Sequence, residues 1–524
     1  MAGAGHVFVV HGRLENLDHD AVVVPTDRAF SVTPVWAAAL GAEHVPDADR
    51  RAAIARLRPE GWADRGWGRA REDAAPFTLL HPMWFVDAAH TLGRERAAEA
   101  VTALAERLAA ALHDVDRAAL TPGSGRPRPV VAVPTLGVGR GGFDPVRGDV
   151  VDRVLAACRD AVAMLGIDVV LVAADASDHA AFQARRRALG GGHEERLGPE
   201  LVAEAQALAD RVAEGSLALF IGAGVSMSAG LPSWGTLIRR LAEDGGVDLG
   251  SLRSPLDQSE LLRRVLGEER LGERVAELTL GGGRYGLSHA LLASLRCAEA
   301  VTTNYDDLYE RAMRDAGHGV MPVLPFNPAV PRAPWLLKMH GDARFPETIV
   351  LSRSDFVGYD ARSRPMGAVV QSLLMTKHLL VVGASMTDDN FLRIAHEVLL
   401  FRAGSTPLDD DDHARGTALG TVVTFAADDA TRRLWEDRFD YVAVAPDDEG
   451  PGPRARRLAI FLDAVAMLAT PPAYVADERY AALLDEPERE VAERARELRR
   501  QIAALPDGAA WAALAQALDD LGAG

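Results

Sequence analysis

Cysteine is almost absent from the sequence. Only Cys158 and Cys297 occur in 524 residues, and neither has a partner at CxxC spacing. Two thiols cannot build a four-cysteine zinc site. We therefore expect both cysteines to be buried free thiols, and we expect the protein to bind no zinc or other metal.

Positive charge and long apolar runs are scarce as well. The formal net charge is −18, whereas a broad nucleic-acid surface needs clustered Lys and Arg. No apolar run approaches the roughly 18 residues that a membrane span needs, and residues 1–11 lack the features of a secretory signal. We expect a cytoplasmic protein that binds neither nucleic acid nor a membrane.

The chain is long enough for about two or three domains. Residues 1–195 alternate strand-like and helix-like segments, which is the pattern of an α/β fold. The predicted strands of this first region are residues 7–10, 21–24, 130–133 and 169–173, and its predicted helices are residues 95–112 and 150–165. A polar connector is predicted at residues 181–200, where Pro199 opens the next helix. A second α/β domain is expected at residues 200–470, followed by a helical tail at 471–524.

Two charged segments of the later part have simple interpretations. Residues 488–505 are dense in Glu, Arg and Ala at helical spacing, which predicts an exposed or partner-facing helix. The acidic run at residues 409–412 has no Gly or Glu at calcium-loop spacing. We interpret this run as a solvated loop.

A glycine turn follows the first predicted strand of the second domain, Leu217–Ile221. Gly222 and Gly224 allow tight turns and let main-chain N–H groups approach a phosphate, and the next helix adds its positive end. That helix places Trp234, Leu237, Ile238 and Leu241 on one face. The turn departs from the GxGxxG pattern, because Gly230 comes six residues after Gly224. A purely structural turn is the alternative interpretation.

Three further strands run into polar turns, at Asn304 and Asp306, at His340, and at Gly383 and Ser385. Each has a plain structural interpretation: Asp306 as a helix cap, Asn304 as a turn residue, and His340 as a buried hydrogen-bonded side chain. In open α/β sheets, however, ligands bind beyond the carboxyl ends of the strands. The four turns together therefore predict one ligand crevice.

The segments GAGVS with AGLPSW, TTNYD, KMHGD and VVGASMTD resemble the sirtuin family in their order and separations. They are more similar to its prokaryotic NAD-hydrolysing branch, and the resemblance covers about half of the chain. It implies a Rossmann-like parallel sheet and an NAD glycohydrolase (NADase) that cleaves its substrate NAD to nicotinamide and ADP-ribose. It also implies anti-phage defence by NAD depletion, a homo-oligomer, and control by a partner ATPase or a phage trigger.

The resemblance also implies roles for individual residues. Asn304 would position the nicotinamide ribose and the attacking water, His340 would act as acid and base, and Asp306 would support the same pocket. The residues implied to bind NAD are Gly222, Ala223, Gly224, Ser226, Trp234, Thr303, Gly383 and Ser385.

The sequence departs from deacetylating sirtuins, which usually carry a four-cysteine zinc module. This departure makes water the expected acceptor. Two alternatives stay open: an NAD-dependent protein deacylase or ADP-ribosyltransferase, and a sensor that holds NAD or ADP-ribose without turnover.

Residues 1–195 contain two segments that are similar to macro domains. Residues 12–18 with Asp20 resemble the macro opening, and residues 134–143 resemble its glycine-rich phosphate loop. The resemblance implies a macro-like α/β domain that binds an ADP-ribose-like nucleotide, with Asp20 facing adenine. Pro25, Thr26 and Asp27 replace the usual Asn-rich stretch, so we expect no hydrolase activity here. An unrelated α/β domain with a glycine turn is the alternative.

Overall fold

A computed structural model describes residues 5–90, 96–117, 120–123, 125–139, 141–280, 283–403, 418–425, 429–446, 448–505 and 509–524. The predicted acidic loop at residues 409–412 lies outside these ranges. The chain divides into two units, of which unit 1 comprises Met1–Arg196 with Ala466–Gly524 and unit 2 comprises Leu197–Val465. Within the described residues, no helix combines the length and the apolar character needed to cross a membrane.

Unit 1 is built on a six-stranded sheet in the order β1-β6-β5-β2-β4-β3. The strands are β1 (Val7–His11), β2 (Ala21–Thr26), β3 (Trp67–Arg69), β4 (Met83–Asp87), β5 (Val130–Pro134) and β6 (Asp168–Ala173). All neighbours are parallel except β3, which runs antiparallel to β4. The central strands are valine-rich and buried except at Pro25 of β2, as expected where helices cover a parallel sheet. The four predicted strands are confirmed, whereas β3 and β4 were not predicted.

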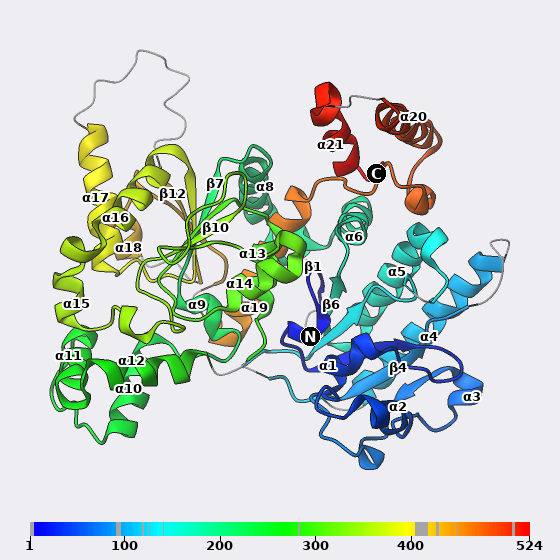
Figure 1. The fold of residues 1–524 in the computed structure, drawn as a ribbon, viewed down its shortest axis with the longest axis horizontal. Helices are drawn as coiled ribbons and strands as arrows, with labels where there is room; N and C mark the ends of the chain where they lie inside the picture. Colours follow the sequence, from blue (N-terminus) through cyan, green and yellow to red (C-terminus); the bar gives the residue numbers. More distant parts are fainter. Residues whose placement is uncertain are drawn as a thin grey trace. The chain divides into compact units, whose positions relative to one another are not determined.

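Three long helices accompany this sheet: α4 (Ala97–Arg117), α5 (Arg147–Leu165) and α6 (Ala176–Ala188) (Figure 1). The first two confirm the predicted helices 95–112 and 150–165. Both cysteines are free and buried, as expected. Burial raises the pKa of the Cys158 thiol well above its ordinary value and that of Cys297 to about 12.

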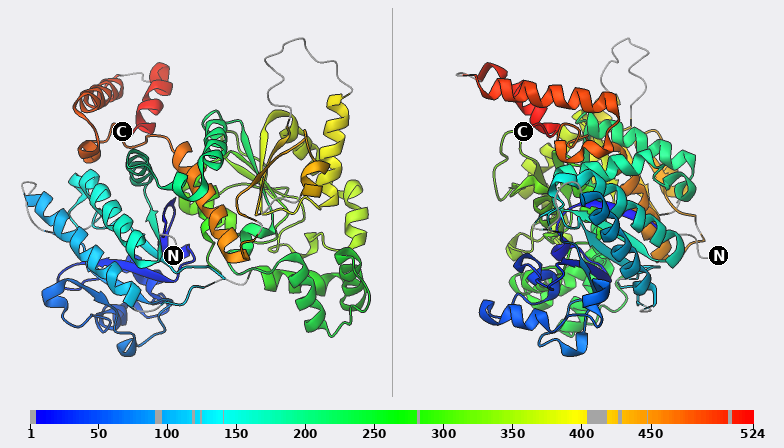
Figure 2. Two further views of the ribbon diagram at one scale, coloured as in Figure 1. Left: turned by 180° about the vertical axis from the view of Figure 1, so that it is seen from behind. Right: turned by 90° about the vertical axis from the view of Figure 1, so that its right-hand side faces the viewer.

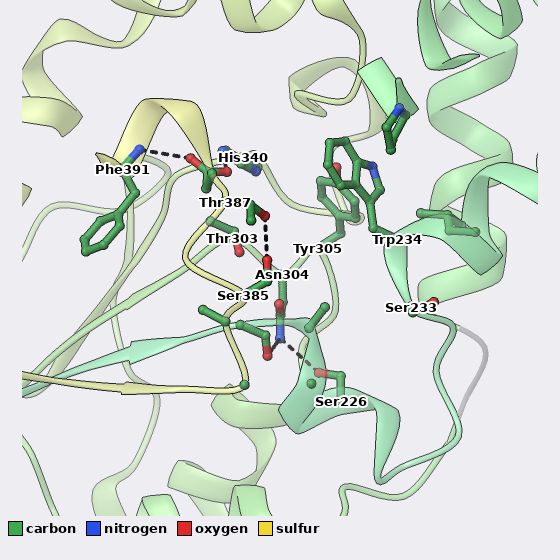
Figure 3. A pocket seen from close by; sticks show the side chains of 18 of the residues that line it. Ser226, Ser233, Trp234, Thr303, Asn304, Tyr305, His340, Ser385, Thr387 and Phe391 are labelled. Carbon is green, nitrogen blue, oxygen red and sulfur yellow. Dashed lines mark hydrogen bonds and ion pairs between the residues drawn. The ribbon is translucent and has the colours of Figure 1, made fainter. Parts of the chain in front are cut away.

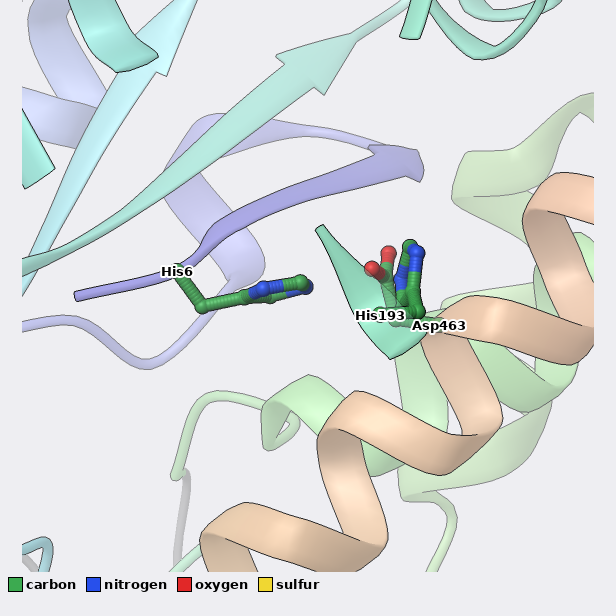
Figure 4. Close-up of side chains that lie close together, drawn as sticks. All are labelled: His6, His193 and Asp463. Carbon is green, nitrogen blue, oxygen red and sulfur yellow. The ribbon is translucent and has the colours of Figure 1, made fainter. Parts of the chain in front are cut away.

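The predicted connector at residues 181–200 is wrong, because most of it is helical. Helix α6 continues to Ala188, α7 covers His193–Leu197, and α8 (Pro199–Ala213) begins at the expected proline. Arg186 is 1% exposed and donates to the Val7 carbonyl at 2.7 Å and to Gln183 Oε1. This segment also places the His193 ring edge to face against His6, with ring centroids 5.0 Å apart (Figure 4). The arginine run that suggested a solvated connector therefore includes Arg186, which hydrogen-bonds to strand β1.

The C-terminal residues pack with unit 1 and do not form an independent tail. Helices α20 (Glu486–Ala503) and α21 (Ala512–Asp520) follow a short segment that contributes Tyr474, Tyr480 and Leu484 to the core of unit 1 (Figure 2). The Tyr480 hydroxyl donates to Asp178 Oδ1 at 2.6 Å, and Arg147 donates to Oδ2 of the same carboxylate at 3.1 Å. The sequence analysis considered the charged composition of α20 and did not predict these contacts. They are made by residues that precede α20.

Unit 2 contains a seven-stranded parallel sheet in the order β13-β12-β11-β7-β8-β10-β9. Its strands are β7 (Leu217–Ile221), β8 (Glu299–Thr302), β9 (Val323–Leu324), β10 (Trp335–Lys338), β11 (His378–Val382), β12 (Gly420–Thr424) and β13 (Asp440–Ala443). Strand β7 pairs with β11 on one side and β8 on the other. The strand order therefore reverses at β7, which is where open α/β sheets bind ligands.

A small helical layer follows β7: α10 (Trp234–Gly245), α11 (Pro255–Leu266) and α12 (Glu268–Thr279) (Figure 1). These helices bury a core of their own, to which Leu237, Ile238 and Leu241 of α10 contribute. The predicted apolar face of this helix is therefore confirmed, and it fixes Trp234 at the start of α10.

Candidate functional site

One cavity of about 570 Å³ lies in unit 2 beyond the carboxyl ends of β7, β8, β10 and β11. Four segments that are distant in sequence therefore meet around it, as the parallel sheet requires. Every site residue predicted from the sequence lines this cavity: Gly222, Ala223, Gly224, Ser226, Trp234, Thr303, Asn304, Asp306, His340, Gly383 and Ser385. Figure 3 shows the Asn304 amide directed toward Ser226, with the hydrogen bond between them drawn as a dashed line.

The glycines of the first turn are needed for contact between two loops. The Gly222 N–H donates to the Val382 carbonyl and the Gly224 N–H to the Gly383 carbonyl, both at 2.9 Å. A Cβ at Gly224 would lie 2.9 Å from Gly383 Cα, and a Cβ at Gly222 would collide with the Gly383 carbonyl. Gly383 itself has a φ of +71°. The turns after β7 and β11 are thus locked together, which shapes this end of the cavity.

The orientation of the Asn304 amide follows from its partners. Asn304 Nδ2 lies 3.1 Å from the Gly222 carbonyl oxygen and 3.0 Å from Ser226 Oγ. A carbonyl oxygen only accepts, so the amide NH₂ must face Gly222. Asn304 Oδ1 is then the atom left over, and it is buried without a hydrogen-bond partner among the residues that the structure describes. Asn304 therefore offers the cavity a hydrogen-bond acceptor.

A polar relay lies behind Asn304, formed by Ser226, Asp306 and His289. Burial lowers the pKa of His289 to about 4, although the charge of Asp306 opposes this, so the ring is neutral at pH 7. The Gly286 N–H donates to Nδ1 at 3.2 Å, which places the ring proton on Nε2, 3.3 Å from Ser226 Oγ. Ser226 Oγ in turn donates to Asp306 Oδ2 at 2.8 Å. The serine hydroxyl is therefore fully used in holding Asn304 and Asp306.

His340 follows β10 and is 5% exposed. Burial lowers its pKa below the usual value, and the nearby charge of Asp388 partly opposes this shift. His340 Nε2 lies 3.2 Å from Asp388 Oδ2, an ion-pair distance whose angle does not meet hydrogen-bond geometry. The imidazole is consequently neutral near pH 7 and able to accept a proton.

A buried ion network supports the loops that carry these residues. Lys338 Nζ lies 3.0 Å from Glu310 and 3.0 Å from Asp342, and it donates to the carbonyls of Tyr305 and Asp306. Burial alone would lower the pKa of Lys338, but the two carboxylates raise it above its ordinary value. One ammonium group thereby links the turn after β8 to the turn after β10.

Aromatic side chains form another part of the cavity lining. Trp234 stacks on Phe356 with ring centroids 6.2 Å apart, and Phe356 also contacts His340 edge to face at 5.2 Å. Among the described residues, Trp234 Nε1 has no hydrogen-bond partner. The cavity lining thus combines flat apolar faces with buried polar atoms, including Asn304 Oδ1 and Trp234 Nε1.

Sequence reasoning missed His289 and the contact made by Asp388. His289 lies within the apolar helix α13 (Leu287–Ser294), where an isolated histidine gives no signal of function. Asp388 is the last residue of the VVGASMTD segment, so the sequence placed it in the predicted crevice loop. Its contact with His340 could not be predicted, because that contact depends on the packing of β11 beside β7.

Unit 1 has a separate pocket of about 460 Å³ lined by residues that follow β2, β4 and β5. Thr26, Thr135, Gly137 and Gly139 line it, as the glycine-rich loop predicted. Asp20 does not, because it precedes β2 and lies at the opposite end of the sheet. Its carboxylate accepts from the Gly123 and Val130 N–H groups and from Arg126. The expectation that Asp20 faces a ligand beside the glycine loop is therefore wrong.

Residues 298–438 match the family of SIR2-like domains. This chain contains a SIR2-like domain. The match begins just before β8 and ends just before β13, so it includes Asn304, His340 and Ser385.

Curated relatives match about a third of the chain. The NAD(+) hydrolase ThsA of Bacillus cereus (strain MSX-D12) is 31% identical over 34% of this chain and 39% of its own length. The protein of the same name from Acinetobacter baumannii (strain 532279) is 28% identical over 34% of this chain and 38% of its length. Defense-associated sirtuin 2 of Bacillus subtilis is 26% identical over 34% of this chain and 18% of its length. Less than half of each relative is therefore represented in the match.

A solved structure titled Oceanobacillus iheyensis macrodomain with MES bound is 12% identical and covers 35% of this chain and 90% of that one, with a TM-score of 0.26. A TM-score this low does not establish a shared fold. The α/β class of unit 1 rests on its own mixed sheet, and the macro-like assignment stays an expectation.

Proposed function

We propose that the cavity of unit 2 hydrolyses NAD at the bond between nicotinamide and ribose, releasing nicotinamide and ADP-ribose. The observation that carries the proposal is the placement of the Asn304 carbonyl and the neutral His340 imidazole on one cavity. Its volume is within the roughly 300–1,000 Å³ usual for ligand pockets. The relatives named NAD(+) hydrolase support the same substrate.

The chemistry needs positioning more than a strong nucleophile. Loss of neutral nicotinamide from its cationic form leaves oxocarbenium character on the ribose, so a held water molecule and a weak base suffice. Asn304 Oδ1 would accept a hydrogen bond from water or a ribose hydroxyl, and His340 would take the proton. The aromatic faces of Trp234 and Phe356 would receive a flat ring.

We further propose that this activity serves anti-phage defence in the cytoplasm. The protein would act as a homo-oligomer whose NADase activity is switched on by a phage trigger or a partner ATPase. The similarity to Defense-associated sirtuin 2 of Bacillus subtilis supports the defence role. Expression in bacteria with measurement of cellular NAD before and after phage infection tests it. A constant NAD level throughout a productive infection would oppose this role.

Chromatography of the reaction products separates the candidate activities. Purified protein is incubated with NAD, with and without an acyl-lysine peptide, and nicotinamide and ADP-ribose are followed over time. We expect equal release of both products without peptide. NAD loss that requires the peptide would favour the deacylase or transferase alternative, and NAD binding without turnover would favour the sensor.

For unit 1 we propose an ADP-ribose-like nucleotide as the ligand of the pocket beside Gly139. Within the described part of the chain, Thr26 Oγ1 and Thr135 Oγ1 are buried there without hydrogen-bond partners. A Cβ on Gly139 meets nothing within 4 Å, so Gly139→Trp should fill the pocket without strain. In calorimetry of the full chain, Gly139→Trp should remove one ADP-ribose equivalent, whereas Gly450→Trp, equally open, should not. Unchanged stoichiometry in Gly139→Trp would contradict this assignment.

A further inference from the structure

Asp388 connects the helix after β11 to His340. Its Oδ1 accepts from the Phe391 N–H at 2.9 Å, near the start of α17 (Asp389–Ala403), and its Oδ2 lies 3.2 Å from His340 Nε2. The carboxylate is 22% exposed and lines the cavity. Each oxygen thus has a different, fixed partner.

Among the described residues, the aromatic side chains that contact the His340 ring are uncharged. Phe356 of α15 (Arg353–Val357) contacts the ring at 5.2 Å between centroids, and Tyr359 of α16 (Tyr359–Thr376) at 6.2 Å. Burial raises the pKa of Tyr359, so its phenol is neutral at pH 7. The Val350 N–H donates to the main-chain carbonyl of His340 and leaves the ring untouched. The charge that acts on the imidazole is that of Asp388.

A carboxylate is negatively charged and donates no hydrogen bond, so it favours the tautomer of a nearby neutral histidine whose N–H is closest to it. Asp388 Oδ2 lies 3.2 Å from Nε2, outside hydrogen-bond geometry, so it is the charge of Asp388 that favours a ring proton on Nε2 and a lone pair on Nδ1. We propose that Asp388 is a positioning residue, which holds His340 in the tautomer whose Nδ1 accepts the proton in the hydrolysis proposed above.

The step balances with water as the nucleophile. As the water oxygen bonds to the ribose carbon, the bond from that carbon to nicotinamide breaks and its electron pair returns to the ring nitrogen. The water proton passes to His340 Nδ1. The resulting imidazolium is stabilised by the charge of Asp388.

Asp388→Asn tests the proposal sharply because the Phe391 N–H dictates how the new amide lies. The Asn carbonyl must occupy the Oδ1 position to accept that N–H, so its NH₂ faces His340 Nε2. The negative charge beside Nε2 is thereby replaced by a partly positive group, which favours the ring proton on Nδ1. Asn also caps helices about as well as Asp, so the fold should be preserved.

We expect kcat for NAD to fall about 100-fold or more with KM changed much less, because general base catalysis contributes about 10²–10⁴-fold. Any residual activity should show its acid limb moved to lower pH, because loss of the Asp388 charge favours the neutral imidazole. Asp388→Glu should restore part of the rate. Asp429→Asn, which removes the exposed first carboxylate of α18 (Asp429–Leu434), should match the wild type.

A second readout does not depend on turnover. NMR titration of the histidine rings should give a lower pKa for His340 in Asp388→Asn than in the wild type. If the wild type cleaves no NAD but this pKa falls as expected, the proposed hydrolysis is wrong and the contact stands. A kcat within twofold of wild type, or an unmoved His340 pKa, would overturn the proposal for Asp388.

Discussion

Single atoms decide what the candidate site offers a ligand. The sequence indicated Asn304, Ser226 and Asp306 as neighbours, but only the structure shows that Ser226 Oγ is occupied by all three of its possible partners. The hydroxyl therefore holds the Asn304 amide, and the ligand-binding role expected for Ser226 remains a prediction without a free atom to perform it.

Removing the Ser226 hydroxyl should loosen Asn304. In Ser226→Ala, Asp306 and His289 each lose a buried partner, so we expect a loss of about 1–3 kcal/mol in the free energy of unfolding. NAD turnover should fall as well, because the Asn304 amide keeps only one of its two anchors. Urea unfolding and nicotinamide release measure the two effects. Ser228→Ala serves as the control because Ser228 Oγ donates to the local Val225 carbonyl, three residues earlier in the chain. Equal stability of both variants would contradict the relay.

A second prediction for a single residue concerns Lys338. Lys338→Met keeps the length and apolar stem of the side chain but removes the buried cation that Glu310 and Asp342 share, so that both carboxylates keep the partly exposed Arg344. We expect a destabilisation of up to about 3–5 kcal/mol, because Arg344 compensates only in part. Lys377→Met, at a lysine that is 22% exposed, should cost far less in the same urea titration. A small effect at Lys338 would mean that the network does not support the site.

At the scale of elements, periodicity located the buried strands and helices but not the contacts between distant segments. The valine-rich strands and the apolar face of α10 are consequences of burial, so their patterns identify them. The connector at 181–200 was predicted wrongly because three consecutive arginines indicate solvent, and the sequence cannot show that Arg186 bonds to a carbonyl of β1. Strand β3 has three residues, too few for any period.

The segment before α20 gives a prediction for unit 1. Tyr480→Phe removes the hydroxyl that bonds to the buried Asp178, so unit 1 should lose about 1–2 kcal/mol of stability. Tyr309→Phe is the matched control, because the buried Tyr309 hydroxyl has no hydrogen-bond partner. Thermal unfolding of both variants tests the difference. A Tyr480→Phe variant as stable as Tyr309→Phe would show that this contact contributes nothing.

For the whole molecule, the lowered pKa values of the buried histidines determine how we expect the free energy of unfolding to depend on pH. Burial lowers the pKa of His289, His318 and His378 to about 4 each. In the unfolded chain these groups bind protons below about 6.5, while in the folded chain they remain neutral until about 4. The contribution of these histidines to the free energy of unfolding should therefore be fully present above about pH 6.5 and decrease as the pH falls towards 4. His289→Gln should reduce this slope, and His44→Gln, whose ring is 90% exposed, should not. A slope unchanged by His289→Gln would contradict the assignment.

Metal content is a second property of the whole chain that separates the candidate activities. Two buried cysteines cannot form the zinc module of a deacetylase, so we expect no stoichiometric zinc in purified protein by elemental analysis. One zinc per chain would favour the deacylase alternative.

The central claim is that unit 2 cleaves NAD with Asn304 and His340. Nicotinamide release by the wild type and by Asn304→Ala, measured side by side with their melting temperatures, tests it most directly. The account predicts rapid release by the wild type, a loss of about 100-fold or more in Asn304→Ala, and a folded variant whose melting temperature is lowered, because the Gly222 carbonyl and Ser226 Oγ each lose one hydrogen bond. Equal release by two folded proteins would contradict it.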